Sequence, residues 1–160
     1  MEWREVAGNW LLVPSNPVGI IHFLGGAFVA AAPSVTYGWL LEILYEQGYA
    51  IVATPVINSF DLGAIATEVL TTFDQAMIYL RRQVIGDRHL PIYGMGHSMG
   101  CKVHLLIASL YNVERAGNIL ISFNNYPARK SIPLLEQFVQ FAPDFDLEFT
   151  PSPNQTLGLV

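Results

Sequence analysis

The sequence has few charged residues and little basic character. Only 13% of its 160 residues are charged, against about 25% in an average soluble protein, while 52% are hydrophobic. So little charge favours a sheet that is buried on both faces over one with a solvent-facing side. The 8 basic residues are outnumbered by 13 acidic ones, which gives a formal net charge of −5, and they form no stripe. We therefore expect no nucleic acid partner.

Cysteine and long apolar runs are also scarce. The single cysteine, Cys101, excludes an internal disulfide framework and a multi-cysteine zinc site, and we expect it to be a small buried hydrophobe. No apolar run reaches the roughly 18 residues needed to span a bilayer. The first five residues, MEWRE, lack the basic-then-apolar layout of a signal peptide. We expect a cytoplasmic protein with no transmembrane segment, no metal and no cofactor.

Apolar strand patterns alternate with helical ones along the chain. Strands are expected at 10–13, 19–24, 49–54, 90–93 and 118–123, and helices at 37–47, 62–84 and 101–110, with Asp61 as the N-cap of the second helix. Such alternation predicts right-handed βαβ units in one domain over 1–160. The expected fold class is a three-layer α/β/α sandwich with a mainly parallel sheet.

The last thirty residues differ from the rest of the chain in their sequence pattern. Apolar and aromatic residues at helical spacing over 131–149 predict either a cap over a site or an ordinary core-facing helix. Ser152 and Pro153 then resemble the start of a further helix that has no stop signal before Val160. We therefore expect a fold truncated at its C-terminus. A truncated sheet would expose an apolar edge, so self-association is a possible consequence.

The most informative motif is G-x-S-x-G at 96–100. It joins a predicted strand to a predicted helix, which is where a nucleophile elbow holds its serine on a sharp turn. Side chains at Gly96 or Gly100 would collide with the neighbouring strand and helix, while His97 is expected to pack beneath the turn. The helix N-terminus would aim its free N–H groups at charge developing beside Ser98. Ser98 is thus the candidate nucleophile for acyl transfer.

Two backbone N–H groups are needed to hold the oxyanion of such a reaction. One comes from the residue after the nucleophile, here Met99. The second comes from the loop after an earlier strand, where Gly25-Gly26-Ala27 offers Ala27 or Gly26. Glycine lets the backbone approach a substrate carbonyl closely. The alternative for this loop is an ordinary strand-ending turn.

The base and the acid of a catalytic triad are not evident. A serine hydroxyl needs a base to take its proton, and in this fold the chain order is serine, acid, histidine. Only His104 follows Ser98, about 9 Å along its helix; His89 precedes the motif at the other end of the sheet, and His22 has only remote geometry. Asp144 and Asp146 lie in the suspected cap segment rather than at a strand end.

Three strings carry a family resemblance: HFLGGAF at 22–28, GMGHSMG at 94–100 and FTPSP at 149–153. The motif and the preceding Gly-Gly loop resemble the α/β-hydrolase superfamily. Together the strings resemble an uncharacterised family of cyanobacterial and chloroplast α/β-hydrolase-like proteins, catalogued as a domain of unknown function. Members of that family are longer, so the resemblance implies that the acid and the histidine lie beyond Val160. The superfamily also contains members that have lost catalysis.

Three functions remain open from the sequence. The first is a serine hydrolase (esterase, thioesterase or lipase-like) acting on an apolar acyl substrate, with this chain lacking the triad histidine and acid and nearly inactive alone. The second is a non-catalytic α/β-hydrolase scaffold that binds a lipid, pigment or protein partner. The third is a dinucleotide site at the glycines of 94–100, which is weakened because Asn124 and Asn125, not an acidic residue, follow the next strand.

Overall fold

The computed structural model of the chain describes residues 1–27, 30–56 and 61–125. Met1–Phe123 form one compact unit, and every strand and helix given below belongs to it. The expected cap segment at 131–149 and the helix after Ser152 lie outside the described residues. The expected single domain over 1–160 also extends into that region. The cap segment, the further helix and the single domain therefore stay predictions.

A mixed sheet forms the middle layer of the unit. Among the described residues it has six strands in the order β1-β2-β4-β3-β5-β6. Their bounds are β1 Arg4–Val6, β2 Asn9–Leu12, β3 Gly19–Leu24, β4 Tyr49–Ala53, β5 Ile92–His97 and β6 Gly117–Ile121. Strands β4, β3, β5 and β6 run parallel to one another, as expected. The pairings of β1 with β2 and of β2 with β4 are antiparallel.

Strand β1 and its turn into β2 are the part of the sheet that the sequence analysis missed, whereas β2 itself matches the strand expected at 10–13. Its two turn residues, Ala7 and Gly8, both have positive φ, 50° and 79°. Two successive positive φ values make the type I′ turn that joins antiparallel strands most compactly. Alanine is an uncommon residue at the first of these positions, so the turn carried no clear sequence signal.

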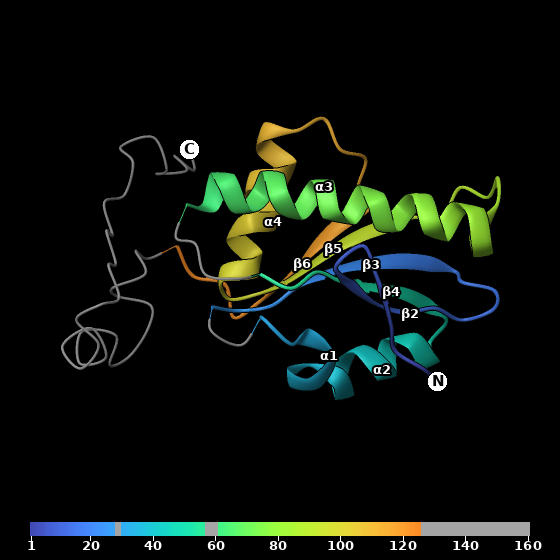
Figure 1. The fold of residues 1–160 in the computed structure, drawn as a ribbon. Helices are drawn as coiled ribbons and strands as arrows, with labels where there is room; N and C mark the ends of the chain where they lie inside the picture. The colour runs from blue at the N-terminus through green and yellow to red at the C-terminus, as the bar shows by residue number, and fades with distance from the viewer. Residues whose placement is uncertain (28–29, 57–60, 126–160) are drawn as a thin grey trace. The chain divides into compact units, whose positions relative to one another are not determined.

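Helices cover both faces of the sheet, which confirms the expected three-layer arrangement. Their bounds are α1 Pro33–Thr36, α2 Gly38–Glu46, α3 Leu62–Leu80, the π-helical turn Arg81–Ile85 and α4 Met99–Leu110. Figure 1 shows α1 and α2 on one face and α3 and α4 on the other. Asp61 caps α3 by accepting hydrogen bonds from the amides of Gly63 and Ala64, both at 3.0 Å. None of the described helices combines the length and the apolar character needed to cross a membrane.

Strand β3 is the centre of the core because all six of its residues are buried. Its side chains alternate between the two faces, as in any strand. Ile21 and Phe23 pack with Leu41 of α2, while Ile20 and Leu24 pack toward the opposite layer. The near-continuous apolar sequence of β3 is therefore explained by its burial on both faces.

Strand β5, which leads into the G-x-S-x-G motif, begins and ends later than its apolar run predicts. β5 spans Ile92–His97 rather than 90–93, and α4 begins at Met99 rather than 101. Pro91 lacks the N–H that strand pairing needs, which delays the start. Gly94 and Gly96 are poor strand formers by propensity, but their lack of side chains leaves room for the neighbours that pack on β5. Tertiary packing thus overrides local preference here.

Two glycines allow α4 to rest backbone against backbone on the sheet. A Cβ placed on Gly100 would lie 2.2 Å from the carbonyl oxygen of Leu24, and one on Gly96 would lie 2.5 Å from the amide nitrogen of Cys101. Neither neighbour is a flexible side-chain end, so the main chain itself would have to move. The steric reason expected for these glycines is what the structure shows.

A buried polar chain connects β3, β4 and β2 beneath α3. The Nε2–H of His22 donates to Thr54 Oγ1 at 3.0 Å, and the Thr54 hydroxyl donates to Asn9 Oδ1 at 2.6 Å. The Asn9 amide then donates to three backbone carbonyls, including that of Thr72 in α3. Each of these three side chains is almost fully buried, so the hydrogen bonds offset their desolvation.

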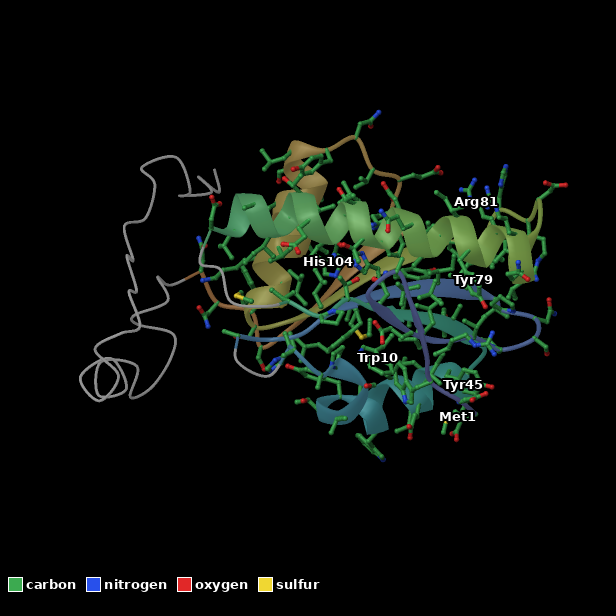
Figure 2. All side chains as sticks on the ribbon, in the orientation of Figure 1. Met1, Trp10, Tyr45, Tyr79, Arg81 and His104 are labelled. Carbon is green, nitrogen blue, oxygen red and sulfur yellow. The ribbon has the colours of Figure 1, made fainter. Side chains whose placement is uncertain are left out.

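His104 and Arg115 extend this buried cluster. The His104 ring lies edge-on to His22 with ring centroids 5.1 Å apart, and Figure 2 shows it between α3 and the sheet. Neither ring nitrogen of His104 has a hydrogen-bond partner within the described ranges. The Arg115 guanidinium lies over the Phe73 ring and 3.5 Å from His22 Nδ1. Burial, reinforced by the Arg115 charge, lowers the pKa of His104 to about 4.

This cluster predicts a loss of stability in mild acid. The folded pKa of His104 lies below its ordinary 6.5, so between those values the unfolded chain binds a proton that the folded chain does not. The free energy of unfolding should therefore fall by about 2 kcal/mol from pH 7 to pH 5 through His104 alone. The pKa of His22 is also lowered, mainly by burial, and acts in the same direction. Urea unfolding at the two pH values measures the change.

The variant His104→Gln should remove about that much of the pH dependence. His89→Gln is the matched control, because His89 is exposed. An unchanged pH dependence in His104→Gln would contradict the assignment.

A second prediction follows from the glycine contacts. Gly100→Ala should destabilise the fold by about 2–3 kcal/mol, because the added methyl group overlaps the β3 backbone. Gly38→Ala is the control: at the start of α2, the nearest atom to its added Cβ is Glu42 Oε1 at 3.9 Å. Alanine favours a helix over glycine by up to about 1 kcal/mol, so this variant should be neutral or stabilised. Equal stabilities of the two variants in chemical unfolding would refute the steric explanation.

Candidate functional site

Ser98 is the single residue between β5 and α4. Its backbone angles are φ 52° and ψ −111°, an unfavourable conformation for a residue with a side chain. Such strain costs on the order of 1–3 kcal/mol and persists only where neighbouring structure enforces it. Here the Ser98 amide donates to the Ile121 carbonyl at 2.9 Å, and the Ser98 carbonyl accepts from the Cys101 amide at 3.1 Å. The serine is half-buried, at the tip of a strand-turn-helix junction.

The Gly-Gly loop after β3 lies directly against this turn. A Cβ placed on Gly26 would be 3.4 Å from Ser98 Cβ and 3.0 Å from His97 Nδ1. Parallel pairing of Leu24 with Gly96 brings the two strand ends to the same edge of the sheet. The structure therefore brings together the two segments that the sequence analysis paired.

The backbone amides at this junction differ in availability. Met99 is the first residue of α4, where an N–H has no partner four residues earlier in the helix. The Gly26 amide, in contrast, donates to the hydroxyl of Tyr37 at 2.9 Å. Of the two loop residues considered as donors, Gly26 is thus engaged, which leaves Ala27 as the candidate.

The structure places none of the four histidines on the Ser98 hydroxyl. His97 bonds through Nδ1 to the Tyr37 hydroxyl at 3.0 Å, and is half-buried beside the turn. His22 and His104 belong to the buried cluster beneath α3, and His89 is exposed just before β5. Within the part of the chain that the structure describes, no side chain hydrogen-bonds to Ser98 Oγ.

An acid partner is not found at the strand end next to the elbow. β6 ends at Ile121, and the residues that follow include the amides Asn124 and Asn125. Asp144 and Asp146 lie outside the described residues, so their part in a site stays untested. Over the described ranges, no group of three histidine, cysteine, aspartate or glutamate side chains is arranged to hold a metal ion.

Cys101 lies inside the elbow and is not a second nucleophile. Its side chain is fully buried, and its S–H points to the Gly96 carbonyl at 3.1 Å. Burial raises the pKa of the thiol, which keeps it protonated. The expected small buried hydrophobe is confirmed.

Tyr37 is the site residue that the sequence analysis missed. It was identified only as the beginning of a helix, and it precedes α2. Its partners Gly26 and His97 are 11 and 60 residues away in sequence. Contacts between residues so far apart in the sequence leave no local sequence pattern. The proximity of Tyr37 to a Gly-Gly loop was the one available hint.

Comparisons with solved structures support the fold. The dienelactone hydrolase from Anabaena variabilis has a TM-score of 0.56 and 19% identity over 78% of this chain and 61% of its own. The thermostable carboxyl esterase from Bacillus coagulans has a TM-score of 0.56 and 17% identity over 85% of this chain and 44% of its own. A lipase in its open form has a TM-score of 0.59 and 17% identity over 92% and 49%. Such identities show the fold alone, which is that of the α/β-hydrolases.

The chain spans roughly half the length of the solved structures that it matches. No curated protein matches it in sequence. A family model does match, over residues 2–160, and its description is "Protein of unknown function (DUF1350)". The match covers nearly the whole chain, and the expected resemblance to an α/β-hydrolase-like family of unknown function is confirmed. This protein is therefore a member of the DUF1350 family, built on an α/β-hydrolase scaffold.

Proposed function

We propose that Ser98 is the nucleophile of a serine hydrolase that acts on an apolar acyl substrate. The observation that carries the proposal is the strained position of Ser98 between β5 and α4, against the Gly26 loop. A binding scaffold has no need for a serine in that conformation. Acyl transfer needs a hydroxyl that projects beyond the sheet edge, next to free backbone amides.

The reaction would proceed by covalent catalysis. Ser98 Oγ attacks the acyl carbonyl carbon and gives its proton to a base, while the carbonyl electron pair moves onto oxygen. The amides of Met99 and Ala27 hold that oxyanion. Collapse expels the leaving group with the proton, and water then hydrolyses the acyl-serine by the same steps.

The proposed hydrolase needs a base, and among the residues that the structure describes no histidine hydrogen-bonds to Ser98. His22 and His104 are enclosed in the core, and His97 is bonded to Tyr37. We therefore propose that the triad histidine and acid come from outside this chain, in a longer protein. The chain by itself should be nearly inactive as an esterase.

An apolar substrate is supported by the chemistry around the elbow. The two segments that meet there, 25–27 and 96–100, contain no formally charged residue apart from a histidine that can protonate. The half-buried Met99 packs against the apolar cluster between α3 and α4. An acyl chain would meet hydrocarbon rather than charge at this position.

A non-catalytic scaffold is the second candidate function. The observation in its favour is that no described side chain hydrogen-bonds to Ser98 Oγ, the bond that an assembled triad would make. On this hypothesis the elbow is structural, and the same apolar region binds a lipid, pigment or protein partner.

Fluorophosphonate labelling separates the two candidates. The probe reacts when an activated serine attacks phosphorus and displaces fluoride, so it needs a working base. We expect the longer gene product to be labelled at Ser98 and this chain to be labelled at least about 100-fold more slowly. Mass spectrometry of the labelled peptide identifies the site.

The control is a second serine on the same helix. Ser109 is exposed and its hydroxyl bonds to the Leu105 carbonyl, so Ser109→Ala should leave labelling unchanged while Ser98→Ala abolishes it. Absence of Ser98 labelling in the longer, folded protein would overturn the hydrolase proposal and favour the scaffold. Rapid labelling of the isolated chain would show that one of its own histidines acts as the base.

A further inference from the structure

We infer that Tyr37 is the positioning residue of the site. It holds the Gly-Gly loop after β3 and His97 in fixed positions relative to Ser98. The inference rests on the proposed function for its catalytic meaning. Its structural basis is one hydroxyl shared by two segments: the Gly26 amide at 2.9 Å and His97 Nδ1 at 3.0 Å. No other described side chain hydrogen-bonds to both the β3 loop and the elbow.

Packing contacts hold the ring of Tyr37 in place independently of the hydrogen bonds that its hydroxyl makes. The ring contacts Phe23 of β3 with centroids 4.7 Å apart and His97 with centroids 5.6 Å apart. A Cβ placed on Gly25 would lie 2.7 Å from Tyr37 Cε2, so the loop backbone lies flat on the ring. The hydroxyl is therefore held by a rigid side chain rather than by a flexible one.

The chemistry of the donors fixes the direction of the Gly26–Tyr37 hydrogen bond and favours one direction for the Tyr37–His97 bond. An amide N–H can only donate, so the Tyr37 oxygen accepts from Gly26. The tyrosine O–H is then free to donate to His97, which requires an unprotonated Nδ1. In the arrangement that we propose, in which the tyrosine O–H donates, neutral His97 carries its proton on Nε2, the nitrogen that does not face Tyr37.

The Gly26–Tyr37 hydrogen bond also indicates which residue would be the second oxyanion donor. With its amide committed to Tyr37, Gly26 anchors the loop, which leaves the amide of the following residue, Ala27, as the proposed donor. Two glycines in a row would otherwise leave this loop with wide conformational freedom. The anchor keeps the donor in place before the substrate arrives, which is the condition for effective oxyanion stabilisation.

Tyr37→Phe tests this inference because it removes the hydroxyl and keeps the ring. The folded variant should show faster hydrogen exchange at the Gly26 amide, by about 10-fold, which is the loss of one ordinary hydrogen bond. The Leu41 amide is an internal control because it donates to the Tyr37 backbone carbonyl, which the substitution leaves in place. Nitrogen-15 spectra of the His97 ring should change from one dominant tautomer to a mixture.

Tyr45→Phe is the matched variant, since Tyr45 lies on α2 and packs against the same core cluster. Figure 2 labels this residue. It should leave the Gly26 exchange rate and the His97 tautomer as they are in the wild type. In the protein that fluorophosphonate labels, Tyr37→Phe should slow the maximal labelling rate about 10-fold with little change in probe affinity, whereas Tyr45→Phe should change neither.

Each outcome decides one proposal. Unchanged Gly26 exchange and an unchanged His97 tautomer in Tyr37→Phe would overturn the positioning role, even if Ser98 is labelled normally. A change in both, together with slower labelling, supports it. If the wild type is not labelled, the hydrolase proposal fails, and the exchange and tautomer measurements still decide whether Tyr37 anchors the loop.

Discussion

The backbone contact between α4 and the end of β3 is the constraint on which the site depends. Because Gly100 has no side chain, the first turn of α4 rests against the Leu24 carbonyl, with no space for even a methyl group. That contact fixes where the helix begins relative to the sheet. The position of Ser98, of the Met99 amide and of the Gly26 loop all follow from it. A single added carbon would alter the distance from Ser98 to the Gly26 loop, and the proposed acyl transfer would tolerate little displacement.

The two ends of β3 illustrate two uses of polar groups in one strand. Within the strand, His22 is enclosed with Thr54 and Asn9, and its hydrogen bonds connect β2 and β4 across the layer beneath α3. Past its carboxyl end, the amide of the buried Gly26 donates to the hydroxyl of the half-buried Tyr37. Burial, with smaller contributions from His104 and Arg115, lowers the pKa of His22, so its protonation opposes folding.

The sequence predicted those features that depend on short-range patterns. The glycines around Ser98, the β3 run, the Asp61 cap and the helix ended by Gly48 each follow from local rules, and the structure has them. It did not predict the β1–β2 hairpin, because Ala7 occupies a positive-φ position where glycine or asparagine is usual. The same limit applies to Tyr37 and Arg115. Their contacts with His97 and His22 span 60 and 93 residues, and such contacts leave no periodic trace in a single sequence.

Strain alone does not establish the role of Ser98. Ala7 and Ser122 also have positive φ, 50° and 52°, and Ala7 serves a turn with no chemistry attached. What separates Ser98 is its surroundings: it lies at a helix N-terminus, beside a glycine whose added Cβ would come within 3.4 Å of the serine Cβ. Glycine at position 98 would relieve the strain, so a serine there is explained best by a use for its hydroxyl. The fold stabilises an unfavourable backbone conformation that holds this serine at the N-terminus of α4 and against the Gly26 loop, and this combination is what supports the acyl-transfer proposal.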